Sequence, residues 1–506
     1  MTLSPIEIEK RPVQAYRQLV DGRLGEAASA ERFGRQSPAH DMQVGCYPLA
    51  DVADADMAVS AARVAFDEGP WPRMSAAERS GMLATVADLI AANAEELALI
   101  DVLESGKPIT QARAELEGAV DLWRYAATRA RAIEGTVPAG LGQHMLGLIE
   151  RVPIGVVAMI TPWNFPFVIL SQKLPFALAA GCTVVLKPSE LTPGSTLRLG
   201  ELLTEAEMPP GTVNLIVGHG QTVGQRLAEH DDVDMISFTG STQVGRSVAR
   251  AAAGNLKKVS LELGGKNPQI VCADADLDAA ADAVVFGVFF NAGQCCNSSS
   301  RLIVEASVEE QFHKRLVELA ERVPFGDPLD PATKIGAIIN DAQMDKIETY
   351  VAQAISQGAS PLCGTRRIDG GPGRFFEPTV MANVTSDMDI ARDEVFGPVL
   401  STMRFDGLSE AIAIANDTHY GLSAGIWTGN YDRAVCAARD LRAGTIWVNC
   451  WMDGFAEMPF GGMRQSGLGR EQGAQAVEEF TELKSVLFHR GERSDRWVPN
   501  GHNRNP

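Results

Sequence analysis

Between about residues 150 and 253, short apolar runs alternate with amphipathic stretches. Strands are predicted at 152–160, 182–186, 213–217 and 233–238, and helices around 168–180, 195–207, 221–229 and 242–253. This rhythm predicts βαβ units, and therefore a parallel sheet with helices on its faces. Because such sheets bind ligands at the carboxyl ends of their strands, we expect functional residues in the turns that follow them.

A second block with the same rhythm runs from about 264 to 465. Strands are predicted at 267–272, 301–304 and 444–449, and helices around 277–290, 308–322, 341–357 and 431–441. This block predicts a second α/β domain. The apolar run 481–489 lies outside both blocks and predicts a late strand, which pairs either with a partner subunit or with the edge of its own domain.

The first 150 residues follow a different pattern. Residues 1–50 predict an irregular or short-stranded segment, since turn signals interrupt them. Ser75-Ala-Ala-Glu78 fits a capping box, and helical spacing then continues until Gly106-Lys-Pro108, which predicts one helix over this range.

Composition narrows the class of protein. The chain has 506 residues with 22% charged and 45% hydrophobic positions, typical of a globular protein of about three folding units. Its net charge of −19 disfavours binding to nucleic acid or anionic membranes, and its longest apolar run is far shorter than the ~20 residues of a membrane span. No export signal is recognised, and eight cysteines without a CxxC pair favour a reducing cytoplasm and predict no metal site.

Three segments carry residue types suited to acyl chemistry. The segment Asn291-Ala-Gly-Gln-Cys-Cys296 lies between an apolar helix and a polar loop, where a thiol can reach a pocket. The alternative is a pair of inert buried thiols. Glu262 ends an apolar strand, where burial raises a carboxyl pKa toward that of a general base, unless it is a solvated edge residue. Asn164, between two prolines, is either a rigid oxyanion donor or part of a structural turn.

Two further segments suit a dinucleotide. Phe238-Thr-Gly-Ser-Thr-Gln-Val-Gly245 places backbone N–H groups at a helix N-terminus, where phosphates bind, but it is neither GxGxxG nor a Walker A motif. Lys187-Pro-Ser-Glu190 follows a strand, and an acid at this place suits ribose hydroxyls and favours NAD over NADP; a surface ion pair is the alternative.

The order and spacing of these motifs resemble the aldehyde dehydrogenase superfamily from about residue 20 to 490. The motifs are TPWNFP, KPSE, FTGSTQVG, ELGGK, GQCC, EVFGP (394–398), PFGG (459–462) and SGLGRE (466–471). The resemblance implies an α/β fold with two parallel-sheet domains and a β-hairpin oligomerisation arm. It assigns residues 1–130 and 150–263 to an NAD-binding domain, 264–467 to a catalytic domain, and 131–149 with 478–497 to the arm of a homodimer or homotetramer.

By the same resemblance, Cys296 is the nucleophile that forms a thiohemiacetal and then a thioester. Asn164 and the Cys296 N–H hold the oxyanion, Glu262 activates the hydrolytic water, and Lys173 and Glu471 relay the proton. The expected NAD contacts are Ile160, Thr161, Pro162, Trp163, Lys187, Ser189, Glu190, Gly220, Gly224, Phe238, Thr239, Gly240, Ser241, Leu263, Glu394 and Phe396.

The substrate pocket departs from that of many relatives. Gln172 stands where many aliphatic-aldehyde enzymes carry Trp, and Gly454 where some carry Phe, which predicts a wider and more polar pocket. The expected pocket residues are Phe165, Ile169, Gln172, Cys295, Asn297, Gly454, Glu457 and Phe460, with Glu115 and Glu117 at a tunnel mouth. They suit a betaine-type aldehyde, an aminoaldehyde or a hydroxylated aldehyde. The alternatives are a non-catalytic NAD-binding structural protein and a cysteine-dependent ester hydrolase.

Overall fold

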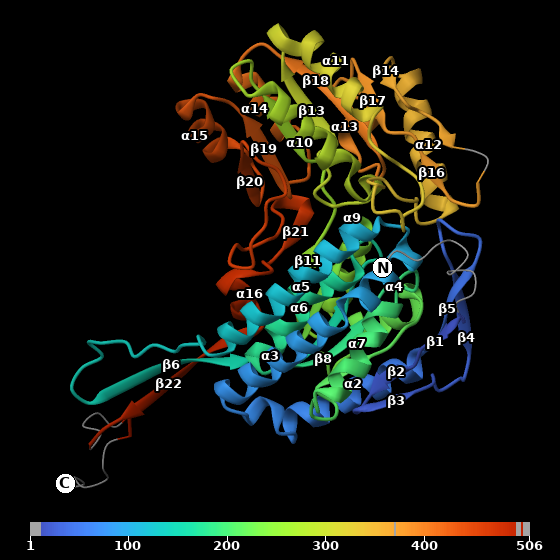
Figure 1. The fold of residues 1–506 in the computed structure, drawn as a ribbon. Coiled ribbons are helices and arrows are strands. Elements are labelled where there is room, and N and C mark those ends of the chain that lie inside the picture. Colours follow the sequence, from blue (N-terminus) through green and yellow to red (C-terminus); the bar gives the residue numbers. More distant parts are fainter. Residues whose placement is uncertain (1–11, 369–370, 492–496, 499–506) are drawn as a thin grey trace, which may run out of the picture.

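Two β-sheets surrounded by helices form an upper and a lower lobe, and a two-stranded ribbon projects from the lower lobe (Figure 1). The computed structural model describes residues 12–368, 371–491 and 497–498. Helices cover both sheets, so each lobe encloses its own apolar core.

The lower sheet has eight strands in the order β21-β11-β10-β7-β8-β9-β2-β3. They are β2 (Gln18–Val20), β3 (Arg23–Gly25), β7 (Val156–Ile160), β8 (Thr183–Lys187), β9 (Val213–Leu215), β10 (Met235–Thr239), β11 (Lys258–Glu262) and β21 (Gly467–Leu468). The five central strands are parallel, as predicted. Between them run α6 (Pro166–Ala180), α7 (Gly194–Glu205), α8 (Gln225–Glu229) and α9 (Thr242–Ala252). The turns after β7, β8, β10 and β11 therefore meet at one sheet edge.

The upper sheet has seven strands in the order β14-β17-β18-β13-β12-β19-β20. They are β12 (Pro268–Val271), β13 (Arg301–Glu305), β14 (Ser360–Cys363), β17 (Thr379–Ala382), β18 (Val399–Phe405), β19 (Ser423–Trp427) and β20 (Thr445–Val448). Only β14 is antiparallel to its neighbour. The main helices are α10 (Leu277–Phe289), α11 (Glu309–Ala320), α12 (Asp341–Ser356), α14 (Leu408–Asn416) and α15 (Tyr431–Asp440). The predicted second α/β unit is confirmed.

The amino-terminal part combines a small sheet with four helices. The sheet holds β1 (Gln14–Ala15), β4 (Arg32–Gln36) and β5 (Gln43–Pro48), and the helices are α2 (Val52–Asp67), α3 (Ala76–Ala92), α4 (Ala94–Ser105) and α5 (Ile109–Ala130). The Ser75 capping box is confirmed, but the single helix expected up to Gly106 is wrong. The chain leaves helical geometry at Asn93, whose side-chain amide donates to the Leu89 carbonyl at 2.8 Å.

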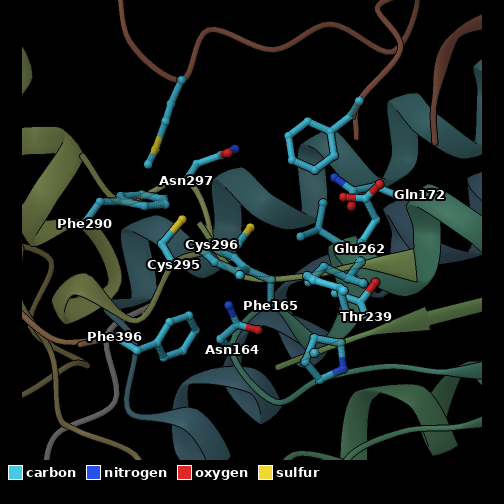
Figure 2. A pocket seen from close by; sticks show the side chains of 18 of the residues that line it. Asn164, Phe165, Gln172, Thr239, Glu262, Phe290, Cys295, Cys296, Asn297 and Phe396 are labelled. Atoms are coloured by element: carbon cyan, nitrogen blue, oxygen red, sulfur yellow. The ribbon is translucent and has the colours of Figure 1, made fainter. Parts of the chain in front are cut away.

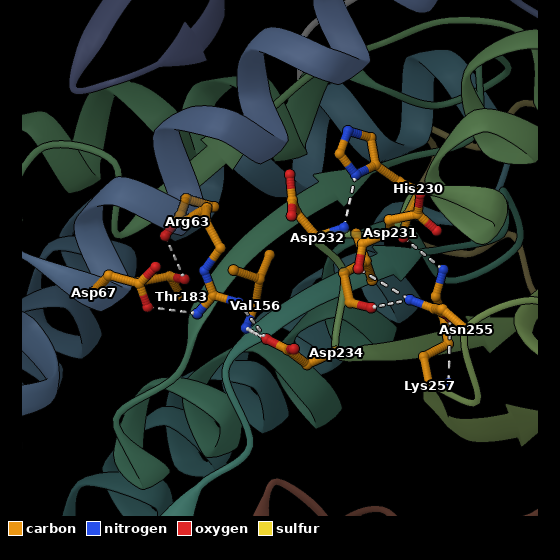
Figure 3. A network of polar contacts seen from close by, with 12 residues as sticks. Arg63, Asp67, Val156, Thr183, His230, Asp231, Asp232, Asp234, Asn255 and Lys257 are labelled. Atoms are coloured by element: carbon orange, nitrogen blue, oxygen red, sulfur yellow. Dashed lines mark hydrogen bonds and ion pairs between the residues drawn. The ribbon is translucent and has the colours of Figure 1, made fainter.

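The projecting ribbon pairs β6 (Met145–Pro153) with β22 (Thr481–His489) in antiparallel register. The late strand thus has the predicted bounds, whereas the strand expected at 152–160 is divided between the ribbon and β7. The chain turns at Gly155, whose φ is +132°. The Asp234 carboxylate then accepts the Val156 N–H at 2.7 Å and an Arg63 N–H at 2.8 Å, which fixes the start of β7 (Figure 3).

The strands of the ribbon also differ from the ranges expected for the oligomerisation arm. The first ribbon strand extends to Pro153, beyond the boundary at 149. The strand β21 lies at the end of the segment 264–467 assigned to the catalytic domain, but it pairs with β11 of the lower sheet. The three-part division of the chain stays a prediction. Within the described residues no helix is both long and apolar enough to cross a membrane, and the eight cysteines are free.

Candidate active site

A cavity of about 480 Å³ lies where the two lobes meet. Its walls come from the turns after β7, β10 and β11 of the lower sheet and from the loops at 295–297 and 394–396 of the upper lobe. Figure 2 shows the side chains of Asn164, Cys296 and Glu262 together in this cavity. Residues from widely separated motifs therefore share one site.

Cys296 is held by the cysteine loop, residues 290–297. Three consecutive residues of this loop, Asn291, Ala292 and Gly293, adopt left-handed backbone angles, which turn the chain sharply after α10. The Asn267 side-chain amide donates to the Cys296 carbonyl at 2.7 Å. A hydrogen bond to Cys295, together with burial, raises the pKa of the Cys296 thiol well above its usual value, so the thiol is protonated at neutral pH.

Asn164 is buried in the turn between β7 and α6. Its side-chain N–H₂ donates to the backbone carbonyl of Gln294 at 3.1 Å. Its own backbone carbonyl accepts an N–H of the Asn291 side chain at 3.0 Å. A primary amide has two N–H groups. With one N–H bound to Gln294, the other is available to a ligand in the cavity that Asn164 lines.

Glu262 ends β11 with its carboxyl at the cavity wall, and it is 3% exposed. Within the described part of the chain its Oε1 has no hydrogen-bond partner. Burial, followed by the nearby Glu471 carboxylate, raises its pKa well above the usual value, while the Lys173 ammonium opposes this. Glu262 therefore becomes a base at a higher pH than an ordinary glutamate does.

Lys173 and Glu471 form a buried ion pair behind Glu262. Lys173 Nζ also donates to Ser237 Oγ at 3.0 Å and does not line the cavity, whereas Glu471 does. Reciprocal backbone hydrogen bonds of 2.7 Å between Glu471 and Phe460 fix that strand segment.

The edge of the lower sheet has the features that a dinucleotide needs. The buried hydroxyls of Thr161 and Thr239 lack partners among the described residues, and Ser241 caps the N-terminus of α9, where N–H groups favour phosphate. Lys187 and Glu190 lie 3.6 Å apart at the end of β8. These residues have the chemistry that an NAD site needs, since a carboxylate and an ammonium suit ribose hydroxyls and helix N–H groups suit phosphates.

Only some of the expected cofactor residues line the cavity itself. Those that do are Pro162, Trp163, Thr239, Gly240, Ser241, Leu263, Glu394 and Phe396. The others lie outside the lining. Gly220 and Gly224 bound a short helical turn between β9 and α8, and the rest lie in or directly after β7, β8 and β10, namely Ile160, Thr161, Lys187, Ser189, Glu190 and Phe238. Glu394 accepts the Gly265 N–H at 3.1 Å, and burial raises its pKa to about 7.

The expected substrate residues also divide into two groups. Phe165, Ile169, Gln172, Cys295, Asn297, Gly454, Phe460 and Glu115 line the cavity. Glu457 and Glu117 are exposed and do not contribute to the lining. Glu117 follows Glu115 by two residues on α5, which places it about 200° around the helix and away from the site.

Several lining residues were not expected from the sequence. They are mainly apolar and aromatic, and include Val168, Phe286, Phe290, Trp447 and Met452. Lys107 packs behind them, with its Nζ 4.5 Å from the centre of the Phe165 ring. Val168, Phe286 and Trp447 lie in helices or a strand, whereas Phe290 and Met452 lie outside the long helices and strands. They come from separate segments, so no local signal distinguishes them.

Comparison with known proteins identifies the family. The sequence model described as "Aldehyde dehydrogenase family" matches residues 26–486. Retinaldehyde dehydrogenase 3 from Homo sapiens is 42% identical over 494 residues, 97% of this chain and 96% of that protein. Betaine aldehyde dehydrogenase from Bacillus subtilis (strain 168) is 41% identical over 479 residues, 94% and 98% of the two chains.

A solved structure agrees with these relatives. An NAD-dependent aldehyde dehydrogenase from Sinorhizobium meliloti is 50% identical, with a TM-score of 0.96 over 98% of this chain and 99% of that chain. The chain belongs to the aldehyde dehydrogenase family. It is an NAD-dependent enzyme that oxidises aldehydes, as the motifs predict, so the non-catalytic alternative is set aside.

Proposed function

We propose that Cys296 is the nucleophile, Asn164 the oxyanion donor and Glu262 the base that activates water. The observation that carries this assignment is the convergence of a thiol, a fixed amide and a buried carboxyl on one cavity. The Cys296 thiol loses its proton to solvent and its sulfur bonds to the aldehyde carbon. The carbonyl electrons become an oxyanion that accepts the free Asn164 N–H and the Cys296 backbone N–H. This amide hydrogen bonding stabilises the charge where it develops.

NAD, when bound, supplies the acceptor for the hydride that leaves the former carbonyl carbon. The residues that would hold it are Lys187 and Glu190 at a ribose, Ser241 at the phosphates, and Glu394 with Phe396 at the nicotinamide end. Phe396 packs edge-on against Trp163 with ring centres 5.4 Å apart, which fixes that end of the cavity.

Glu262 completes the reaction by removing a proton from water that attacks the thioester on Cys296. The carbon–sulfur bond breaks, the sulfur leaves as a thiolate and the carboxylic acid is released. We assign the Lys173 and Glu471 pair to the exit of that proton, because both charges act on Glu262 and the two side chains form a buried ion pair.

The cavity lining narrows the class of aldehyde. Phe165, Phe290 and Phe460 surround the substrate end, and ring faces attract cationic groups as well as apolar tails. Glu115 is the acid on this wall; it is paired with Lys107 and accepts the Gln111 amide at 2.8 Å. We therefore propose an aldehyde with a compact cationic tail, of the betaine or amino class. Gln172 and Asn297 are polar lining residues that a hydroxylated tail could use, and the rings make an aromatic tail the second candidate.

A panel of aldehydes tests this proposal. We expect kcat/KM, measured as initial NADH formation at saturating NAD, to be at least about tenfold higher for betaine aldehyde or an aminoaldehyde than for a sugar-derived aldehyde. Glu115→Gln should lower the value for the cationic members and leave that for an aromatic aldehyde within about twofold. Equal loss for both classes, or a preference for the hydroxylated member, contradicts the cationic assignment.

We also propose that the ribbon pairs with a second copy of the chain, giving a dimer or tetramer. An isolated two-stranded ribbon is marginally stable, and this one exposes Leu483 at 65% and Leu487 at 66%. Sedimentation should show a dimer or larger species for the full chain, and Leu483→Lys with Leu487→Lys should shift it toward monomer. A monomeric wild-type chain at micromolar concentration contradicts the assignment.

A further inference from the structure

We propose that Gln294 is a positioning residue that aligns the nucleophile of the upper lobe with the oxyanion donor of the lower lobe; this rests on the roles proposed for Cys296 and Asn164. Gln294 is 1% exposed and does not line the cavity. It therefore acts through the groups that it holds, and both its backbone and its side chain are engaged.

The backbone of Gln294 orients the oxyanion donor. Its carbonyl accepts the Asn164 side-chain N–H at 3.1 Å and the Asn291 side-chain N–H at 3.1 Å. One carbonyl oxygen thus aims the amide of Asn164 and ties it to the loop that carries Cys296, two residues farther along the chain.

The side chain of Gln294 anchors the cysteine loop to the segment 337–339. Nε2 donates to the Ala337 carbonyl at 3.1 Å and to the Asn291 carbonyl at 3.2 Å, and Oε1 accepts the Ile339 N–H at 2.9 Å. All three of these side-chain hydrogen bonds go to backbone groups. The Asn291 contact stabilises the left-handed turn, while the other two hold the loop from outside.

The segment 337–339 is in turn fixed to the lower lobe. The Ala337 N–H donates to the Gly106 carbonyl at 2.9 Å. The Arg35 guanidinium donates to the carbonyls of Ile339, Leu191 and Glu104, at 3.2, 2.7 and 2.9 Å. Through Gln294, the position of the cysteine loop depends on how the two lobes meet.

Alignment of this kind has a large effect on rate, because a misplacement of about 1 Å between reacting groups can cost ~10²-fold. Loss of one oxyanion donor costs a similar ~10²–10³-fold. The Gln294 side chain fixes the loop, and the loop in turn places the Gln294 carbonyl that holds the donor, so loss of this side chain should change kcat much more than the binding of NAD.

The test compares Gln294→Met with Gln269→Met. Methionine keeps the length of glutamine but removes the amide. Gln269 is also fully buried in the upper lobe, with Oε1 accepting the Trp427 indole N–H at 2.7 Å, and among the described residues its side chain makes no hydrogen bond with the cysteine loop. We expect Gln294→Met to lower kcat for aldehyde oxidation and for hydrolysis of p-nitrophenyl acetate by about 100-fold, with KM for NAD within about threefold. Gln269→Met should lower Tm by a comparable amount and leave kcat within about threefold.

A double-mutant comparison separates positioning from general damage. If Gln294 acts through Asn164, then Gln294→Met in an Asn164→Ala background should lower kcat much less than it does in the wild type. If Gln294→Met fails to fold, Gln294→Glu, which keeps an acceptor for the Ile339 N–H, takes its place. Equal kcat for the two methionine variants, a loss confined to KM, or full additivity with Asn164→Ala overturns the inference. Turnover retained by Cys296→Ala overturns the proposed function instead, so the two failures are distinct.

Discussion

Cys296→Ala is expected to lose aldehyde oxidation by a factor of about 10⁴ or more in kcat. The sulfur forms the bond to the substrate carbon, and alanine leaves the oxyanion donors without an attacking group. NADH formation at saturating NAD and aldehyde measures the loss. Iodoacetamide should label the wild-type chain at residue 296, which lines the cavity.

Cys295 supplies a matched control for this replacement. It is the adjacent thiol, 5% exposed, and it lines the same cavity. Removing it also removes the hydrogen bond that raises the pKa of Cys296, so Cys295→Ala should keep kcat within about tenfold and shift thiolate formation to lower pH. Loss of activity in Cys295→Ala with retention in Cys296→Ala contradicts the assignment.

Glu262→Gln is expected to lower kcat by about 10²–10⁴-fold while leaving the first turnover intact. Glutamine preserves the shape of the side chain but cannot accept a proton from water. Rapid-mixing measurements should therefore show a burst of about one NADH per active site, followed by slow turnover, with the acyl group retained on Cys296. Hydroxylamine, an external nucleophile, should restore turnover. Absence of a burst together with no rescue contradicts a role in thioester hydrolysis.

The pH dependence of the wild type follows from the same carboxyl group. Glu262 acts as a base only when ionised, and its pKa is raised above the usual value, so kcat should increase as pH rises through that raised pKa. Glu471→Gln removes the carboxylate that contributes to this shift. The rising limb should then move to lower pH. A shift of that limb to higher pH would contradict the electrostatic coupling.

Local patterns were sufficient wherever one short segment contains all the determinants of a feature. The strand at 481–489, the capping box at Ser75 and Glu78, and the parallel order of both sheets follow from spacing and alternation alone. The motifs containing Asn164, Glu262 and Cys296 also identify the class of chemistry, because each places a specific functional group at the end of a strand or helix.

Features that depend on contacts between distant segments could not be obtained in this way. The chain leaves helical geometry at Asn93, where the side-chain amide shares the Leu89 carbonyl with the backbone N–H. The exclusion of Glu457 and Glu117 from the cavity depends on the direction in which each turn or helix face points. The aromatic character of the cavity also cannot be recognised from any one segment, since Phe290 and Trp447 are far apart in the sequence and meet only at the cavity wall.

The sequence by itself determined the family, the α/β class, the NAD cofactor and the candidate reactive groups, because these depend on residue type and order. The tertiary structure decided which of those groups meet and what surrounds them. Gln294 illustrates the difference. Its partners Asn164, Ala337 and Ile339 are remote in sequence, and only packing of the two lobes brings their backbone and side-chain groups within hydrogen-bond distance.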